Sequence, residues 1–322
     1  MLKQFHYVRP RTVEEAVNLL QHPGSAAHAG GTDLLGCMRD GISEVNRVVS
    51  LSGIGAMKNI QLRGDGSVEI GALATLAEVA ENEMIRKHHT ALSDAAASVA
   101  SPQLRAQGTL GGNLCQRPRC WYFRGDFHCL RKGGDLCYAA AGQNQYHCIF
   151  GGDGCYIVHP SDTASALMAL NAKLTITGSA GNRTIPIESF FVPPSTDVTR
   201  ENILKPGEIL TSISVPAAIE GTRSVYRKVR ERASWDFALA GVAIHMGPGE
   251  KADVPRVVLS GVAPVPWRCR EVERVLARGA LDATAANAAA DAAVAGATPL
   301  EHNAYKVQLV RGLVLETLLS MM

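Results

Sequence analysis

Six of the eight cysteines in this 322-residue sequence are concentrated in one segment, residues 115–155. None of them belongs to a Cys-x-x-Cys pair of the kind usual in structural zinc sites. A chain of this length also needs no disulfide bonds for its stability. Four thiolates can hold a [4Fe–4S] cluster, and nearby basic residues would partly offset its negative charge. The cysteines are Cys115, Cys120, Cys129, Cys137, Cys148 and Cys155, and the basic residues are Arg119, Arg124, Arg131 and Lys132.

Two turns that contain paired glycines could bind phosphate. The first is Ala29-Gly30-Gly31-Thr32-Asp33, and the second runs from Gly108 to Leu114. Adjacent glycines let backbone N–H groups approach an anion closely. Either turn alone is better explained as an ordinary tight turn. Neither has the spacing of a Rossmann fingerprint or a P-loop. Two such turns in one chain suit the pyrophosphate of a dinucleotide, which favours FAD in a non-Rossmann fold.

Two further segments carry polar groups that suit a cofactor. In His159-Pro160-Ser161-Asp162, Asp162 could either cap a helix over 163–170 or offer a carboxylate to a ribose. The basic segment 226–232 includes Lys228 and is followed by Trp235 and Phe237. It could face phosphate or flavin carbonyls, or form a solvated charged edge. His128 and His147 adjoin cysteines but are not predicted as metal ligands.

The elements that position these residues are strands and helices in alternation. Capping signals at Thr12 and Thr75 predict helices, the second continuing to about residue 100. A hairpin is predicted over 174–187 and a strand over 209–215. The last hundred residues predict strands at 224–229, 242–246 and 257–262, then helices at 270–278, 283–296 and 303–320. This order indicates an α+β fold, with domains 1–55, 56–217 and 218–322 and a cysteine-rich insertion at 115–158.

Composition excludes several classes of function. The formal net charge is +2, and no long run of like charges suggests a nucleic-acid partner. No apolar stretch predicts membrane insertion or a signal peptide, so a soluble protein is expected. It would be cytoplasmic, or periplasmic if exported on a partner's signal. No Ser-His-Asp or metalloprotease motif is present, so hydrolysis is not predicted and no catalytic residue is assigned.

Taken together, the two glycine turns, His159-Pro160-Ser161-Asp162 and the basic segment with Ala233-Ser234 resemble the FAD-binding medium subunit of the xanthine dehydrogenase family of molybdenum hydroxylases. The resemblance covers almost the whole chain. Members with a cysteine-bearing insertion after the second turn carry an additional [4Fe–4S] cluster, as in aldehyde oxidoreductase and 4-hydroxybenzoyl-CoA reductase flavoprotein subunits. Gln116-Arg117-Pro118-Arg119-Cys120 is most similar to the aldehyde oxidoreductase type.

The resemblance implies a fold and a set of site residues. The fold would be α+β, a vanillyl-alcohol-oxidase-like (PCMH-like) two-part FAD-binding fold followed by a C-terminal domain of the CO dehydrogenase flavoprotein type. Cys120, Cys129, Cys137 and Cys155 would ligate the cluster, with Cys148 as the alternative fourth ligand. The residues implied to bind FAD are Ala26, Ala27, His28, Ala29, Gly30, Gly31, Thr32, Asp33, Leu34, Thr109, Gly112, Asn113, Arg119, Asp162 and Lys228.

The resemblance also implies partners. A molybdenum-cofactor large subunit would oxidise the substrate, a [2Fe–2S] small subunit would pass electrons to the FAD of this chain, and an external acceptor would receive them. Three alternatives stay open: another molybdenum hydroxylase of the 4-hydroxybenzoyl-CoA reductase type, a zinc-binding interaction scaffold, and a flavin oxidase that is active without partners.

Overall fold

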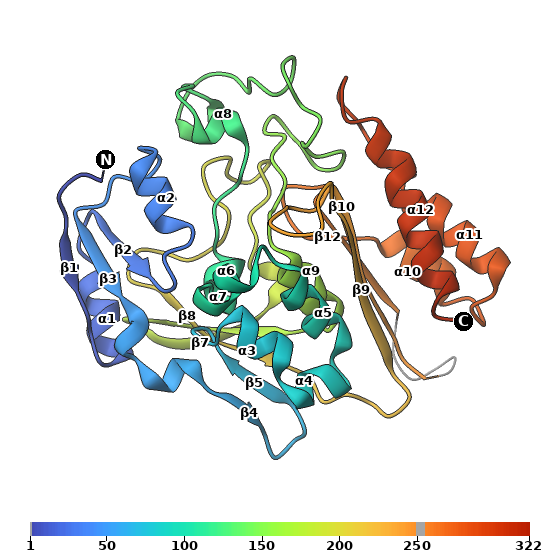
Figure 1. Cartoon of the computed structure of the whole chain (residues 1–322), viewed down its shortest axis with the longest axis horizontal. Helices are drawn as coiled ribbons and strands as arrows, with labels where there is room; N and C mark the ends of the chain where they lie inside the picture. Colours follow the sequence, from blue (N-terminus) through green and yellow to red (C-terminus); the bar gives the residue numbers. More distant parts are fainter. Residues whose placement is uncertain (1, 249–254) are drawn as a thin grey trace.

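The N-terminal part of the chain forms a small parallel sheet. In the computed structural model, which describes residues 2–248 and 255–322, its strands are β1 (His6–Val8), β2 (Ser25–His28) and β3 (Arg47–Ser50). They lie in the order β1-β3-β2 (Figure 1). Helix α1 (Val13–Leu20) joins β1 to β2, and the Thr12 side chain caps it by accepting the Glu15 N–H, as predicted. The first glycine turn then leads from β2 into α2 (Leu34–Arg39).

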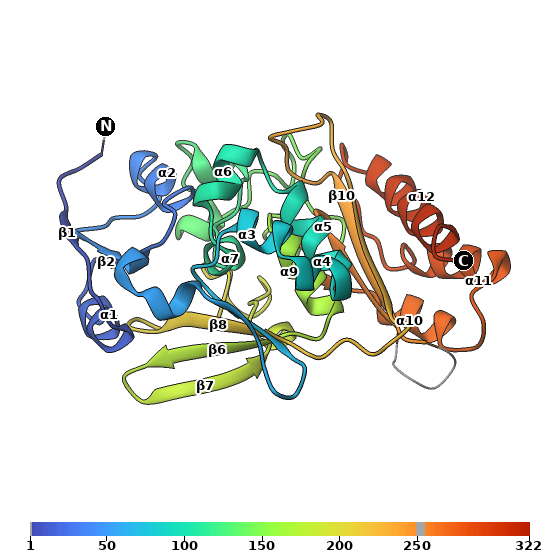
Figure 2. The same cartoon turned by 60° about the horizontal axis from the view of Figure 1, so that its bottom comes forward.

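A five-stranded antiparallel sheet forms the floor of the central part. Its strands are β4 (Ile60–Leu62), β5 (Val68–Gly71), β6 (Lys173–Gly178), β7 (Gly181–Pro186) and β8 (Ile209–Val215), in the order β4-β5-β8-β6-β7. The predicted hairpin is confirmed, with its turn at residues 179–180. Helices lie above one face of this sheet (Figure 2). They are α3 (Leu76–Glu81), α4 (Glu83–His88), α5 (Thr90–Ser98), α6 (Pro102–Gln107), α7 (Leu110–Leu114) and α9 (Asp162–Ala169).

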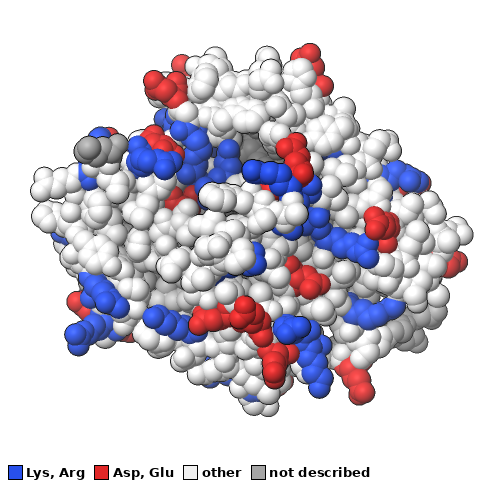
Figure 3. All heavy atoms as spheres, in the orientation of Figure 1, with Lys and Arg blue, Asp and Glu red and all other residues white. Residues whose placement is uncertain are grey.

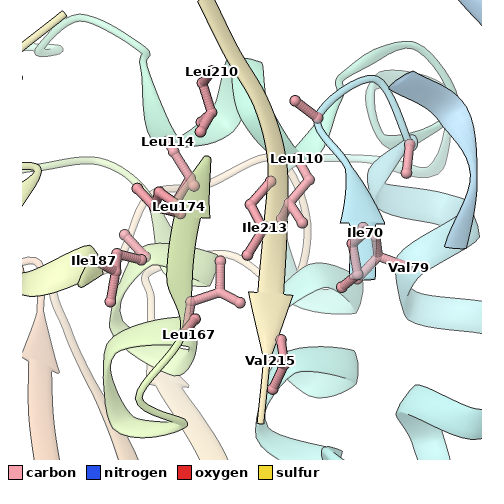
Figure 4. Packing of buried hydrophobic residues seen from close by; sticks show 14 of the residues in the cluster. Ile70, Val79, Leu110, Leu114, Leu167, Leu174, Ile187, Leu210, Ile213 and Val215 are labelled. Atoms are coloured by element: carbon pink, nitrogen blue, oxygen red, sulfur yellow. The ribbon is translucent and has the colours of Figure 1, made fainter. Parts of the chain in front are cut away.

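The main hydrophobic core lies between this sheet and the helices. Apolar side chains of α7 and α9 meet those of the central strands, and all of them are buried. Figure 4 shows the packing of Leu110, Leu114, Leu167, Leu174 and Ile213. Because α7 carries the second glycine turn and α9 carries Asp162, this packing fixes both relative to the sheet.

The long helix predicted between Thr75 and residue 100 is wrong, because the chain forms α3, α4 and α5 there instead. The predicted capping box at Thr75 is present and opens α3. Asn82 then ends α3, and its side chain accepts the Ile85 N–H to start α4. Asparagine competes with the helical backbone through such local bonds, which explains the break.

The C-terminal part is built on a four-stranded antiparallel sheet of order β12-β11-β10-β9. Helices α5 and α9 pack on one face, and the three C-terminal helices cover the outer side (Figures 1 and 2). This predicted succession of strands and then helices is confirmed. The elements are β9 (Arg223–Val229), β10 (Ala240–Met246), β11 (Arg256–Ser260), β12 (Trp267–Arg268), α10 (Arg270–Leu276), α11 (Ala283–Ala292) and α12 (Tyr305–Leu319).

Two connections link the three sheets. One joins β3 to β4 and the other joins β8 to β9. The domain boundaries predicted near residues 55 and 218 fall in these connections and stay a prediction. No helix in the described ranges is both long and apolar enough to cross a lipid bilayer.

The cysteine-rich insertion lies between α7 and α9 and contains little regular structure (Figure 1). Its helix α8 (Trp121–Arg124) has four residues, and a short 3-10 turn follows at Leu130–Lys132. Two buried residues at the start of α12 (Tyr305–Leu319) hold the backbone of the insertion. Asn303 donates to the carbonyls of His147 and Cys148, and Lys306 donates to those of Tyr146 and Gly261. Burial lowers the pKa of Lys306 to about 7.

We expect acid to destabilise this fold partly through His89, which lies between α4 and α5 and is 3% exposed. Burial, with a smaller contribution from His88 and His245, lowers the pKa of His89 to about 4. Between pH 6.5 and 4 the unfolded chain therefore binds more protons, so stability falls as the pH falls through this window. The loss should reach about 3 kcal/mol. Chemical unfolding at pH 7.5, 5.5 and 4.5 measures it.

The matched comparison is His89→Leu against His22→Leu, since His22 is exposed. His89→Leu should flatten the pH dependence of the unfolding free energy, and His22→Leu should not. An equal slope in both variants would show that His89 does not contribute to acid sensitivity.

Candidate cofactor-binding site

A cavity of about 510 Å³ opens where the first glycine turn, the second glycine turn and β9 come together. This volume is in the range of small-molecule and cofactor sites. Thirteen of the fifteen predicted FAD-binding residues line it, and Ala26 and His28 do not. The thirteen are Ala27, Ala29, Gly30, Gly31, Thr32, Asp33, Leu34, Thr109, Gly112, Asn113, Arg119, Asp162 and Lys228.

The two glycine turns pack directly against each other. A Cβ atom on Gly30 would lie 1.9 Å from the carbonyl oxygen of Gln107, immediately before the second turn. Gly31 has a φ of +73°, a left-handed conformation that favours glycine. The Thr109 side chain caps α7 by accepting the Gly112 N–H. Gly30 is therefore needed for the close approach of the two backbones at the edge of the cavity.

Asp162 and Lys228 form a buried ion pair at the cavity wall. The Lys228 ammonium lies 2.7 Å from the Asp162 carboxylate, and both side chains are 4% exposed. The Tyr226 hydroxyl donates to the other carboxylate oxygen at 2.7 Å. Burial and then Asp162 raise the pKa of Tyr226 well above its ordinary value, so the phenol keeps its proton and donates. Asp162 thus has two fixed donors before any ligand binds.

The suggested capping role of Asp162 is wrong. Helix α9 begins at Asp162, but the cap is Ser161, whose hydroxyl accepts the Ala164 N–H. Ser161 and Thr163 also donate to the side-chain oxygen of Asn113. Asn113 is therefore held by α9, which joins the second glycine turn to the Asp162 segment.

Asp33 binds the insertion. Its carboxylate lies 2.8 Å from both Arg119 and Arg124, and it accepts the Arg117 N–H at 2.8 Å. Although Asp33 precedes α2, its side chain makes no capping bond there. Figure 3 shows basic side chains gathered where the insertion meets the rest of the molecule, whereas the outer end of the insertion carries few charges. Cations at this place suit a pyrophosphate.

Some cavity residues were not among the predicted FAD-binding residues. Cys115, which sequence analysis grouped with the other cysteines, lines this cavity, and burial raises its pKa to about 12. Trp235 and Phe237 also line it, and Trp235 is 66% exposed with a φ of +54°. The Trp235 N–H donates to the Ala100 carbonyl. In the sequence, only the position of Trp235 and Phe237 after the basic segment suggested a place near the cofactor. The contact with Ala100 could not be predicted, because Ala100 lies far from Trp235 in the sequence.

The four predicted cluster ligands surround a second, small cavity. Cys120, Cys129, Cys137 and Cys155 all line it, and Cys148 does not. Each of the eight cysteines is a free thiol. Burial raises the pKa of Cys120 to about 11 and also raises that of Cys155. The sequence separations between these cysteines gave no indication of which four would meet.

Two side chains of this second cavity contact its sulfur atoms. Nε2 of His147 lies 3.2 Å from Sγ of Cys120, and the buried Arg131 donates Nε–H to Sγ of Cys155 at 3.5 Å. Within the described residues, no three His, Cys, Asp or Glu side chains converge closely enough to hold one metal ion. In a [4Fe–4S] cluster each cysteine binds a different iron, so the four sulfurs stand farther apart than around one ion.

The fold and the larger cavity define a flavin-binding protein. Residues 3–218 match the FAD binding domain in molybdopterin dehydrogenase, and residues 224–321 match the CO dehydrogenase flavoprotein C-terminal domain. The predicted fold class is therefore confirmed.

Individual relatives agree with these matches. The chain is 36% identical to the aldehyde oxidoreductase FAD-binding subunit PaoB of Escherichia coli, over 96% of each chain. It is 28% identical to the carbon monoxide dehydrogenase medium chain of Hydrogenophaga pseudoflava, over 92% of this chain and 88% of the relative. A structure of that Hydrogenophaga dehydrogenase superposes with a TM-score of 0.77 at 26% identity, covering 98% and 96% of the two chains.

The chain belongs to the FAD-binding medium subunits of the xanthine dehydrogenase family. It is accordingly an oxidoreductase subunit, and the resemblance deduced from its motifs is confirmed.

Proposed function

We propose that this chain is the FAD- and [4Fe–4S]-binding electron-transfer subunit of a molybdenum-containing aldehyde oxidoreductase. The observation that carries the proposal is the likeness to the Escherichia coli aldehyde oxidoreductase subunit over 96% of both chains. The complex would contain a molybdenum-cofactor subunit and a [2Fe–2S] subunit beside this one. Electrons would come from the [2Fe–2S] subunit and leave for an external acceptor, in the cytoplasm or in the periplasm.

The larger cavity suits FAD in its lining residues and their charges. Backbone N–H groups of the two glycine turns and the side chains of Arg117 and Arg119 would face the pyrophosphate. Asp162 and Lys228 would hold the sugar alcohol or the ring system by hydrogen bonds. The bound FAD supplies the redox chemistry, whereas the protein binds it, orients it and excludes water.

The second cavity suits a [4Fe–4S] cluster in its donor set. Cys120, Cys129, Cys137 and Cys155 offer four soft sulfur ligands around one space. Arg131 donates an N–H to the sulfur of Cys155, and Nε2 of His147 lies within hydrogen-bond distance of the sulfur of Cys120. Hydrogen bonds to the sulfurs help to set the potential of a bound cluster. The position of Cys148 outside the cavity favours Cys155 as the fourth ligand.

The first test is the visible spectrum of anaerobically purified protein, with flavin, iron and zinc quantified after denaturation. We expect one FAD and about four irons per chain, as one [4Fe–4S] cluster requires. A colourless protein that contains zinc would overturn the proposal in favour of an interaction scaffold. Full aldehyde turnover by the isolated chain would overturn the subunit role.

Replacing Cys129 by serine should remove the cluster and lower the iron content from about four atoms to near zero. The matched control is Cys148→Ser, because Cys148 is also buried but lies outside the cavity. The control should keep its iron. Iron loss in Cys148→Ser and retention in Cys155→Ser would show that Cys148 is the true ligand.

The same Cys129 variant separates two roles for the cluster. If the cluster relays electrons, a folded Cys129→Ser complex should reduce its acceptor more slowly while its thermal stability is little changed. If the cluster is a structural clip, the main loss should be in folding or assembly. Unchanged turnover by a stable, cluster-free complex would rule out the relay.

A further inference from the structure

We propose that the cysteine-rich insertion fastens the first glycine turn around FAD through an Arg124–Asp33 contact, and that cluster binding at Cys120 thereby tightens FAD binding. The identity of the two cofactors rests on the function proposed above. The contact itself is a feature of this chain, and it joins two binding sites that no local sequence motif connects.

Asp33 accepts the hydrogen bond of this contact. It follows Gly30, Gly31 and Thr32 at the cavity edge, and its side chain is only 16% exposed. Three donors reach its carboxylate, from Arg117, Arg119 and Arg124, and all three belong to the insertion. Because Asp33 makes no capping bond to α2, the insertion supplies its ordering contacts.

Arg124 is the better probe of the contact because it does not line the FAD cavity. Its side chain is 13% exposed and touches both sides of the junction. It donates to the Pro118 carbonyl at 2.7 Å within the insertion. It also reaches Sγ of Cys37 in α2 at 3.0 Å, besides Asp33 at 2.8 Å. A guanidinium can make these bonds together because its donors are fixed in one plane.

Cys120 connects the cluster site to this arginine. Its carbonyl accepts the Arg124 N–H at 2.9 Å, so Cys120 begins the single helical turn that ends at Arg124. A four-residue helix has little stability of its own, so a fixed point at Cys120 should order it. Ordering this turn places Arg124 against Asp33. The coupling must be reciprocal, so FAD should also slow the loss of the cluster.

The first experiment measures FAD affinity of the full-length chain by titrating FAD and following its fluorescence. Arg124→Gln and Asp33→Asn should each weaken FAD binding about tenfold or more, because each removes a partly buried charge-assisted bond. The double variant should bind FAD with an affinity no lower than that of the weaker-binding single variant. Arg124→Lys, which keeps the charge and loses the planar donors, should lie in between.

Arg311→Gln is the matched control, because Arg311 pairs with Asp291 in the C-terminal helices and lies outside the cavity. It should bind FAD as the unchanged chain does. Circular dichroism and thermal melting establish that each variant is folded. FAD affinity within about twofold of the unchanged chain in folded Arg124→Gln would overturn the inference, and so would strictly additive effects in the double variant.

The second experiment compares protein with its cluster and protein from which a chelator has removed the iron. Iron removal should weaken FAD binding in the unchanged chain by about the factor seen for Arg124→Gln, and should have little further effect in that variant. FAD should slow iron release to the chelator in the unchanged chain alone. Iron removal without effect on FAD affinity would overturn the coupling, whereas a chain that never binds iron would overturn the proposed cluster itself.

Discussion

Gly30→Ala is expected to abolish FAD retention. The new Cβ would lie 1.9 Å from the Gln107 carbonyl oxygen and 2.7 Å from the carbonyl carbon, and neither belongs to a side chain that can rotate away. The two glycine turns would have to separate, which removes the backbone cradle on both sides of the pyrophosphate. We expect a loss of about 3 kcal/mol or more, roughly a hundredfold in FAD affinity.

The measurement is the flavin content of the purified protein together with a titration of added FAD. Gly55→Ala is the control, because a Cβ at that position meets nothing within 4 Å. It should retain FAD fully. An affinity for Gly30→Ala within about threefold of the control would mean that the turns tolerate separation and that the cradle does not hold the cofactor.

Lys228→Met is expected to destabilise the protein by about 3–5 kcal/mol, because it leaves the Asp162 carboxylate buried without its cation. The Tyr226 hydroxyl would remain as a donor to Asp162, but a phenol does not neutralise the charge. FAD content should fall as well, since both members of the pair line the cavity. Chemical unfolding and flavin quantification measure the two effects.

Two comparisons make this prediction specific. Lys228→Met combined with Asp162→Asn should lower the free energy of unfolding by less than the sum of the two single changes, because no unpaired charge is left buried. The neighbouring Arg227 pairs with Glu316 at the surface, so Arg227→Gln should cost at most about 1 kcal/mol. Equal costs for Lys228→Met and Arg227→Gln would show that burial of the Asp162 pair has no special importance.

Sequence patterns were most informative where the structural signal is local. The caps at Thr12 and Thr75 and the hairpin over 174–187 each depend on residues within a few positions of one another. The same holds for the paired glycines, whose backbone freedom is a property of the residue itself. The prediction of one long helix failed at Asn82. The helical sequence pattern continues across this residue, but α3 ends there and the Asn82 side chain caps α4.

The arrangement of the site depended on contacts between distant parts of the chain. Lys228 and Asp162 are 66 residues apart, and Arg124 and Asp33 are 91 residues apart. No periodicity relates such positions, so sequence reasoning left Asp162 equally suited to capping a helix and to binding a ligand. Contacts between distant segments also decide where the cysteines lie. Cys115 lines the larger cavity, and four others line the smaller one.

The sequence by itself therefore determined the chemical inventory of this protein: two glycine turns able to approach an anion, a segment rich in thiols, and an order of elements typical of an α+β fold. Motif resemblance to a known family was enough to name the class. Only the tertiary structure decided which of these groups meet, because packing of the helices between the sheets brings remote segments together. Side-chain types follow from the sequence, whereas their distances depend on the path of the whole chain.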